Sequence, residues 1–151
     1  LDDYIRGVLV PGYRTWSGNI RTFPSSVPTL RELKRRGYRL GLITNGGSVT
    51  QWNKIRLLNL EGYFDAIVVA GEYFPKEYWK PHPAPFEKCF AELGVDPSEC
   101  VYVGDDPRFD LPGARALGVH VFLVGSSTLA ASVAKEECTV ISDLRCLLDY
   151  L

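Results

Sequence analysis

From residue 28 onward, the sequence alternates short apolar runs with amphipathic stretches, and only short connections separate them. The apolar runs have the length of buried strands and are bounded by turn residues such as Gly, Asn and Asp. Consecutive parallel strands need a crossover connection, which is usually a helix. The pattern therefore predicts an α/β protein: a Rossmann-like three-layer sandwich with helices on both faces of a mostly parallel sheet.

The alternating segments can be assigned along the chain. Strands are expected at residues 38–44, 66–71, 100–106, 119–125 and 139–142, and helices at residues 28–36, 48–58, 86–93, 111–118 and 144–151. Ser48 and Gln51 have the S-x-x-Q spacing of a capping box, which predicts that the Gln51 side chain bonds back to the start of its helix.

Composition narrows the class of protein. The 151 residues are enough for one domain, and 46% hydrophobic and 23% charged residues are typical of a soluble one. No apolar run approaches the roughly 20 residues of a membrane span. A net charge of −1 disfavours nucleic acid as a partner. The cysteines show no CxxC pair and no zinc spacing, which predicts free thiols in a reducing, cytoplasmic setting: Cys89, Cys100, Cys138 and Cys146.

Polar residues follow the strand expected at residues 38–44. Ligands bind beyond the carboxyl ends of the strands in open parallel sheets. Thr44, Asn45, Gly46 and Gly47 offer a hydroxyl, an amide and backbone N–H groups that lead into a helix, which suits a phosphate or another oxyanion. The same residue types also form ordinary turns, so both readings stay open.

Lys80 stands between an aromatic residue and a proline in the segment WKPHP. A fixed ammonium there could balance phosphate charge or hold a carboxylate, and the alternative is a solvated loop lysine. His82 and His120 are not assigned as general bases, because nothing in the sequence pairs with either of them.

Three carboxylates crowd the turn after the third strand: Asp105, Asp106 and Asp110. Their mutual repulsion would raise the pKa of at least one of them unless a cation neutralises the group. Oxygen ligands without Cys or His favour a hard ion, and we expect Mg²⁺. Helix capping by Asp106 or Asp110 is the alternative, but it accounts for one carboxylate and not for three.

In this order, LITNG, WKPHPAPFEKC and VYVGDDPRFDLPGARALG resemble the second, third and fourth motifs of the haloacid dehalogenase-like hydrolase superfamily, over about residues 23–150. The resemblance implies a Rossmann-like core in which an aspartate nucleophile forms a covalent aspartyl-phosphate while Mg²⁺ shields the transferring group. It also implies that Thr44 hydrogen-bonds a phosphoryl oxygen, that Asn45 helps to shape the same loop, and that Lys80 steadies nucleophile and phosphate.

For the acidic turn, the resemblance implies that Asp105 is the direct Mg²⁺ ligand and Asp110 a supporting acid. Asp106 occupies a position that is often Ser or Thr in relatives, so its place in the metal site is less defined. Dehalogenases of the family, which need no metal, tend to carry small polar residues in this turn in place of the aspartates. The acidic GDD sequence therefore favours a phosphatase over a dehalogenase.

The first motif of the family, an apolar strand ending in DxDxT, is absent from this chain. One explanation is that residues 1–27 are the tail of a helical cap and that the catalytic strand has been lost. The other is a capless pseudoenzyme in which residues 4–15 are a degenerate first strand and loop, with Pro11 and Tyr13 in the aspartate positions. The absence of methionine and the aromatic spacing favour truncation.

Either explanation leaves residues 28–151 as the core domain, without a complete cap. In the family the missing strand is central, between the strands that lead to Thr44 and Asp105, and unpaired backbone groups there cost about 1–3 kcal/mol each when buried. We expect residues 5–10 or a segment of a second copy to fill this position. The space between Thr44 and Lys80 holds a strand and a helix, but no large second cap.

The sequence thus predicts a Mg²⁺-dependent phosphomonoesterase for a small phosphorylated metabolite, in a chain that lacks its nucleophile and is inactive or nearly so alone. The rival hypothesis is a non-catalytic pseudoenzyme or interaction module that keeps a phosphate pocket at Thr44 and Lys80. A haloacid dehalogenase is the third and least favoured reading.

Overall fold

The computed structural model of the protein describes residues 18–133 and 138–151. Its strands are short and all pair in parallel: β1 (Gly41–Thr44), β2 (Ala66–Val69), β3 (Val101–Gly104), β4 (His120–Val124) and β5 (Thr139–Ile141). The α-helices are α3 (Ser26–Arg35), α4 (Ser48–Leu57), α5 (Ala70–Tyr73), α6 (Ala84–Leu93), α7 (Pro107–Ala116) and α8 (Ser127–Ser132). Single 3₁₀ turns are η2 (Glu61–Tyr63), η3 (Lys76–Tyr78) and η4 (Pro97–Glu99), and η5 (Leu144–Asp149) is longer.

Helices cover both faces of the strands, as the alternation of side chains along each strand requires. Val121 and Leu123 of β4 pack with Phe86 of α6 and Leu111 of α7 on one face. Phe122, between them in β4, points to the other face and packs with α3 and η5. Successive side chains of a strand point to opposite faces, so a continuous apolar run requires cover on both. The α/β fold with helices on both faces is therefore confirmed.

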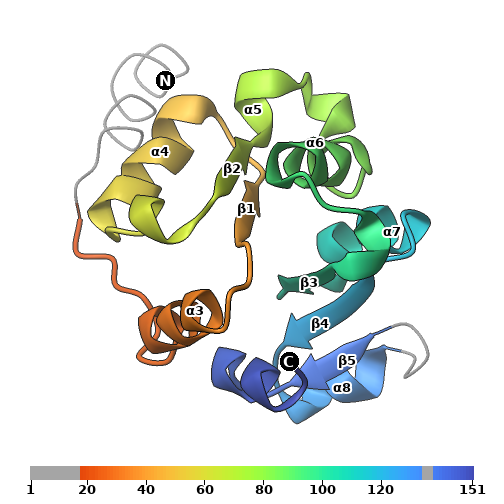
Figure 1. The fold of residues 1–151 in the computed structure, drawn as a ribbon. Helices are drawn as coiled ribbons and strands as arrows, with labels where there is room; N and C mark the ends of the chain where they lie inside the picture. Colours follow the sequence, from red (N-terminus) through yellow and green to blue (C-terminus); the bar gives the residue numbers. More distant parts are fainter. Residues whose placement is uncertain (1–17, 134–137) are drawn as a thin grey trace, which may run out of the picture.

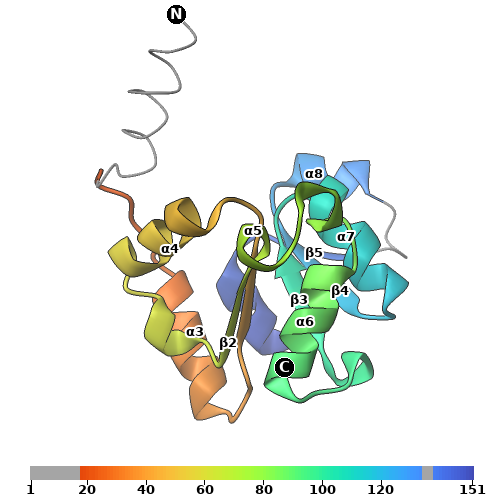
Figure 2. The same ribbon diagram turned by 90° about the horizontal axis from the view of Figure 1, so that it is seen from above.

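The described strands form two sheets, β1-β2 and β3-β4-β5, which are not hydrogen-bonded to each other. In Figure 1, β1 and β3 are the edges that face each other across the molecule, and Figure 2 shows the same two groups of strands from above. Among the described residues, no strand pairs with either facing edge. The predicted occupant, residues 5–10, lies outside the described residues.

Helices hold the two sheets together. α6 packs against β1 and β2, α7 packs against β3 and β4, and α6 also contacts α7. One apolar cluster therefore runs from Ile43 of β1 through Phe86 to Val121 of β4. The predicted boundary between residues 1–27 and the core remains a prediction, since most of that first part is not described. No helix in the described part of the chain is both long and apolar enough to cross a bilayer.

Several sequence predictions at helix ends are wrong. The N-cap of α4 is Gly47, and no side chain caps this helix, so Ser48 and Gln51 do not form a capping box. α7 begins at Pro107 rather than at residue 111, because the Asp106 side chain accepts from the Arg108 N–H and Pro107 suits a first turn.

Two further predictions, one in each half of the chain, are wrong. Residues 144–149 form the 3₁₀ helix η5 and not an α-helix, with Asp143 accepting from the Arg145 N–H at its start. The strand expected at residues 66–71 ends at Val69, because the chain turns into α5 at Ala70. Each expected strand nevertheless has an observed counterpart, which is shorter at one or both ends.

Candidate active site

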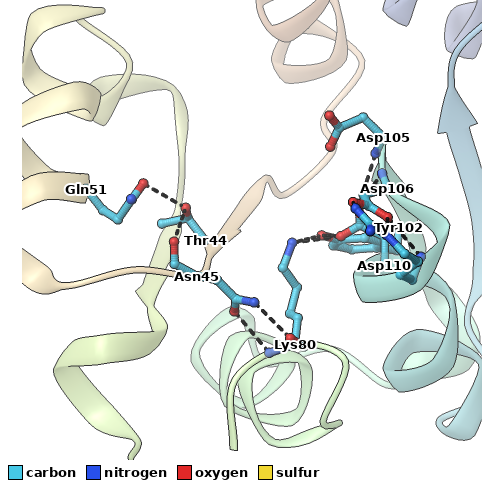
Figure 3. Close-up of polar contacts among 9 residues, drawn as sticks. Thr44, Asn45, Gln51, Lys80, Tyr102, Asp105, Asp106 and Asp110 are labelled. Atoms are coloured by element: carbon cyan, nitrogen blue, oxygen red, sulfur yellow. Dashed lines mark hydrogen bonds and ion pairs between the residues drawn. The ribbon is translucent and has the colours of Figure 1, made fainter. Parts of the chain in front are cut away.

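Lys80 and Asp110 form a buried ion pair at the carboxyl end of β3. The Lys80 Nζ lies 2.7 Å from the Asp110 Oδ1, and the two side chains are only 12% and 2% exposed. Lys80 also donates to the Tyr102 hydroxyl at 2.8 Å, and Tyr102 in turn donates to the Asp110 Oδ1 at 2.9 Å. Figure 3 shows the three groups converging from the loop before α6, from β3 and from α7. Lys80 is therefore not a solvated loop lysine.

The second oxygen of Asp110 organises the acidic turn. Asp110 Oδ2 accepts the backbone N–H groups of Asp105 and Asp106, both at 3.0 Å. Burial alone would raise the pKa of the Asp110 carboxyl, but the hydrogen bond and charge of Lys80 lower the pKa below its usual value. Asp110 therefore stays ionised and fixes the backbone from which the other two aspartates project.

A glycine at the end of β3 makes room for this carboxylate. A Cβ atom on Gly104 would collide with the Cγ and Oδ2 atoms of Asp110. Tyr102, two residues earlier in the strand, packs edge-on against Phe86 with ring centroids 4.9 Å apart. The strand sequence VYVG thus supplies an aromatic side chain, Tyr102, beside the site, and its last residue, Gly104, leaves space for the buried carboxylate of Asp110.

Asn45 joins the end of β1 to the Lys80 loop. Its Nδ2 donates to the Lys80 carbonyl at 2.8 Å, and the Lys80 N–H donates to Asn45 Oδ1 at 3.0 Å. This two-bond amide pair fixes the backbone on which the Lys80 side chain stands. Together with the ion pair to Asp110, it connects the three polar segments that the sequence singled out (Figure 3).

Thr44 lies next to this junction, and its hydroxyl donates to the Gln51 Oε1 at 3.0 Å. Gly46 has a positive φ of 135°, which side chains rarely adopt, and a Cβ there would collide with the Gln51 amide. The Gly46 carbonyl accepts the Gly71 N–H at 3.1 Å. The glycine-rich loop therefore holds Gln51 against Thr44.

The other two aspartates of the turn have different surroundings. Asp106 accepts from Arg108 at 2.7 Å, and this hydrogen bond lowers the pKa of its carboxyl. The carboxylate of Asp105 makes no hydrogen bond or ion pair with a described residue, and it projects away from the Asp110 cluster in Figure 3. Within the described ranges, no group of three or more His, Cys, Asp or Glu side chains is arranged around a metal position.

Two residues of this cluster were missed from the sequence. In the sequence, Tyr102 is part of an apolar strand and Gln51 has the spacing of a helix cap. Neither pattern indicates which distant residue the side chain contacts. The two histidines do not join the cluster: His82 Nδ1 accepts from the Ala84 N–H at 3.1 Å, and His120 Nε2 lies 2.9 Å from the Thr139 hydroxyl.

Known proteins resemble this chain in both sequence and fold. A glyceraldehyde 3-phosphate phosphatase of Methanothermobacter thermautotrophicus is 35% identical over 137 residues, which cover 87% of this chain and 59% of that protein. A crystal structure of a HAD phosphatase from Thermococcus onnurineus matches with a TM-score of 0.75 at 29% identity, over 85% of this chain and 57% of the other.

A crystal structure of a 2-haloacid dehalogenase from Pseudomonas syringae pv. Tomato matches with a TM-score of 0.70 at 31% identity, over 84% of this chain and 51% of the other. The chain spans about half the length of the curated relatives it matches. The family model for haloacid dehalogenase-like hydrolases matches residues 6–118, which include the Thr44 loop, Lys80 and the acidic turn. The chain belongs to the haloacid dehalogenase-like hydrolases.

Proposed function

We propose that this chain supplies the phosphate-binding and metal-binding side of a phosphomonoesterase that acts on a small phosphorylated metabolite. The observation that carries the proposal is the linkage from Asn45 through Lys80 to Asp110, which connects the ends of two separate sheets by side-chain hydrogen bonds. The phosphatase named among the relatives supports this substrate class.

The phosphate would lie between the Thr44 loop and the Lys80 ammonium. An ammonium has three N–H donors, and the described contacts of Lys80 use two of them, toward Tyr102 and Asp110. The third donor and the Thr44 hydroxyl are suited to separate oxygens of one phosphate, with backbone N–H groups at Gly46 and Gly47 completing the pocket. Burial of the ion pair keeps the lysine charge in a fixed position.

The donor chemistry of the acidic turn suits Mg²⁺, which takes oxygen ligands and commonly keeps several waters. We assign the direct protein contact to Asp105, whose carboxylate is not engaged by described residues, with Asp106 beside it. Asp110 would act indirectly, because its oxygens already hold Lys80, Tyr102 and the backbone of the turn. Bound Mg²⁺ would neutralise charge on the phosphoryl group.

The nucleophile is missing from the proposed site. The motif DxDxT is absent from the sequence, and the facing edges of β1 and β3 mark where a further strand would enter. We propose that residues 5–10 or a segment of a second copy pairs there. Without an attacking carboxylate the covalent route is closed, so this chain alone should bind phosphate and turn over little or none of an ester.

The phosphate pocket can be tested by calorimetric titration of the chain with inorganic phosphate and Mg²⁺. We expect phosphate to bind. We expect Thr44→Val to weaken this binding about tenfold or more, because a hydrogen bond from a hydroxyl to a charged group contributes about 1.5–3 kcal/mol. Thr50→Val, on the neighbouring helix α4, is the matched control and should bind like the original chain. Equal affinities of all three proteins would contradict the pocket.

In the same preparation, hydrolysis of p-nitrophenyl phosphate should stay at background. Mg²⁺-dependent turnover that Asp105→Asn abolishes would show that another residue supplies the nucleophile and that the prediction of inactivity is wrong. Binding without turnover is also what the non-catalytic module predicts. A longer chain that carries an apolar strand ending in DxDxT separates the two, because only the phosphatase hypothesis expects turnover from it.

The metal-free dehalogenase remains the least favoured hypothesis, although a 2-haloacid dehalogenase is among the similar structures. Three carboxylates lie in the turn, and a halide-releasing site without metal has no evident use for them. Retention of activity in EDTA by the longer chain would favour the dehalogenase instead. None of the four cysteines forms a disulfide with a described residue, which supports the proposed cytoplasmic setting.

A further inference from the structure

The Gln51 side chain is held against the proposed phosphate pocket and not against its own helix. The S-x-x-Q spacing would direct it to the start of α4, but its Oε1 accepts from the Thr44 hydroxyl at 3.0 Å. The backbone of Gly46 lies against its amide, so a side chain at position 46 would displace it. The Gly46 carbonyl is itself fixed by the Gly71 N–H at 3.1 Å. The end of β1 and the loop after it thus enclose this amide, and α5 fixes that loop through Gly71.

This contact determines where the only proton of the Thr44 hydroxyl points. In the structure the hydroxyl donates to Gln51 and also lies 3.5 Å from the Asn45 carbonyl. A phosphate oxygen that approaches Thr44 in this state meets hydroxyl lone pairs and not a proton. Phosphate oxygens are acceptors, so the hydroxyl contributes to binding only when its proton turns toward them.

A glutamine can release that proton without leaving its place. Rotation of the terminal amide by half a turn exchanges Oε1 for Nε2, and Nε2 then donates to Thr44 Oγ1. The hydroxyl, now an acceptor toward Gln51, is free to donate to an oxyanion. A carboxylate of the same shape would only accept, and a hydrocarbon would do neither.

We infer that Gln51 is a positioning residue that sets the direction of the Thr44 hydroxyl proton: it takes the proton in the empty pocket and frees it when an oxyanion binds. The inference rests on the proposed function, since it assigns a task to a residue of the same phosphate pocket. It adds a restriction that the pocket alone does not make, namely that the side chain at position 51 must be able to release the Thr44 hydroxyl proton.

The test is a double-mutant cycle read by calorimetric titration with inorganic phosphate. Gln51→Glu keeps the shape but cannot donate, and Gln51→Leu removes both functions while leaving the hydroxyl free to rotate. We expect Gln51→Glu to weaken phosphate binding at least about tenfold more than Gln51→Leu. In a Thr44→Val background most of that additional loss should disappear, because only charge repulsion by the carboxylate remains.

A second readout follows the amide itself. The Gln51 side-chain NH₂ resonances, assigned by their loss in Gln51→Glu, should shift when phosphate is added to the original chain. Thermal unfolding of each variant checks that the fold is retained. The inference is overturned if phosphate binds while these resonances stay unchanged, or if the penalty of Gln51→Glu persists undiminished in Thr44→Val.

The outcomes separate this inference from the proposed function. Binding of phosphate to the original chain tests the pocket, whereas coupling between positions 44 and 51 tests the role of the amide. Failure of the original chain to bind phosphate would overturn both. Binding with no coupling would leave the pocket standing and reduce Gln51 to a packing residue.

Discussion

At the scale of single residues, Asp110 shows how one side chain serves several segments. Its two oxygens accept from Lys80, Tyr102 and the backbone N–H groups of Asp105 and Asp106. A buried carboxylate is stable only when it is paired and hydrogen-bonded, and this one is both. Removing its charge would leave Lys80 without its counter-ion in a largely buried position.

Asp110→Asn is expected to lower the free energy of unfolding by about 3–5 kcal/mol at pH 7, the usual cost of breaking a buried pair from one side. The folded-state pKa of Asp110 is below its ordinary value of 3.8, so its contribution is present above that value and lost as the pH falls through the lowered pKa. The difference between variant and original chain should therefore shrink below about pH 4.

Urea unfolding at pH 7 and in the acid range measures this difference. Asp149→Asn is the matched control, because Asp149 is exposed and the substitution removes the same charge from the same chain. A constant difference at all pH values would show that Asp110 acts through packing rather than through its charge.

At the scale of elements, a glycine at or just after the end of a strand leaves space for the polar contacts of the loop that follows. β3 ends at Gly104, where the buried carboxylate of Asp110 occupies the space that a side chain would need. β1 ends at Thr44, and Gly46, the residue after Asn45, has a positive φ. In both loops a glycine permits close approach, while the neighbouring polar residue makes the contact.

Gly104→Ala should force Asp110 away from the turn, at a cost of about 1–3 kcal/mol in stability, as overpacking of a filled interior does. Phosphate affinity should fall as well, because Lys80 loses its fixed partner. Gly62→Ala is the control, since Gly62 in η2 has open space around it, and it should change stability by less than about 0.5 kcal/mol. Thermal unfolding and titration of both variants would show whether the space at position 104 matters.

At the scale of the whole molecule, two parallel sheets share one core, and the strand expected between them is outside the described residues. The Leu40 carbonyl accepts from the Ala66 N–H, and backbone groups alternate in direction along a strand. Gly41 and Ile43 therefore direct their N–H groups away from β2, toward the edge that faces β3. Ile43 is 9% exposed, so an unpaired group at this position would be costly.

We expect the amides of Gly41 and Ile43 to exchange hydrogen within about tenfold of those of Leu42 and Thr44, because a strand pairs with this edge in solution. Protection independent of protein concentration would identify residues 5–10 as that strand, and protection that grows with concentration would identify a second copy. Fast exchange at both residues over the whole concentration range would show that the edge stays open.

The sequence by itself determined the fold class, the succession of strands and helices along the chain, and the family. Local patterns predict these features. The patterns are apolar runs of strand length, glycines at turns, and polar residues directly after the strands, such as Asn45 and Asp105. It also indicated that Lys80 and the acidic turn belong to one site, through the resemblance of the surrounding motifs. The fold class and the succession of elements follow from neighbours along the chain, whereas the joint site follows from the resemblance.

Only the tertiary structure decided which atoms meet. The capping-box spacing of Gln51 was misleading, because the Thr44 hydroxyl lies across a glycine loop and offers this side chain a partner other than the backbone of α4. Tyr102 gave no sign of its bond to Lys80, since contacts between residues distant in sequence depend on how the helices pack the strands together. Hydrogen bonds are short and directional, so their partners follow from three-dimensional placement and not from spacing along the chain.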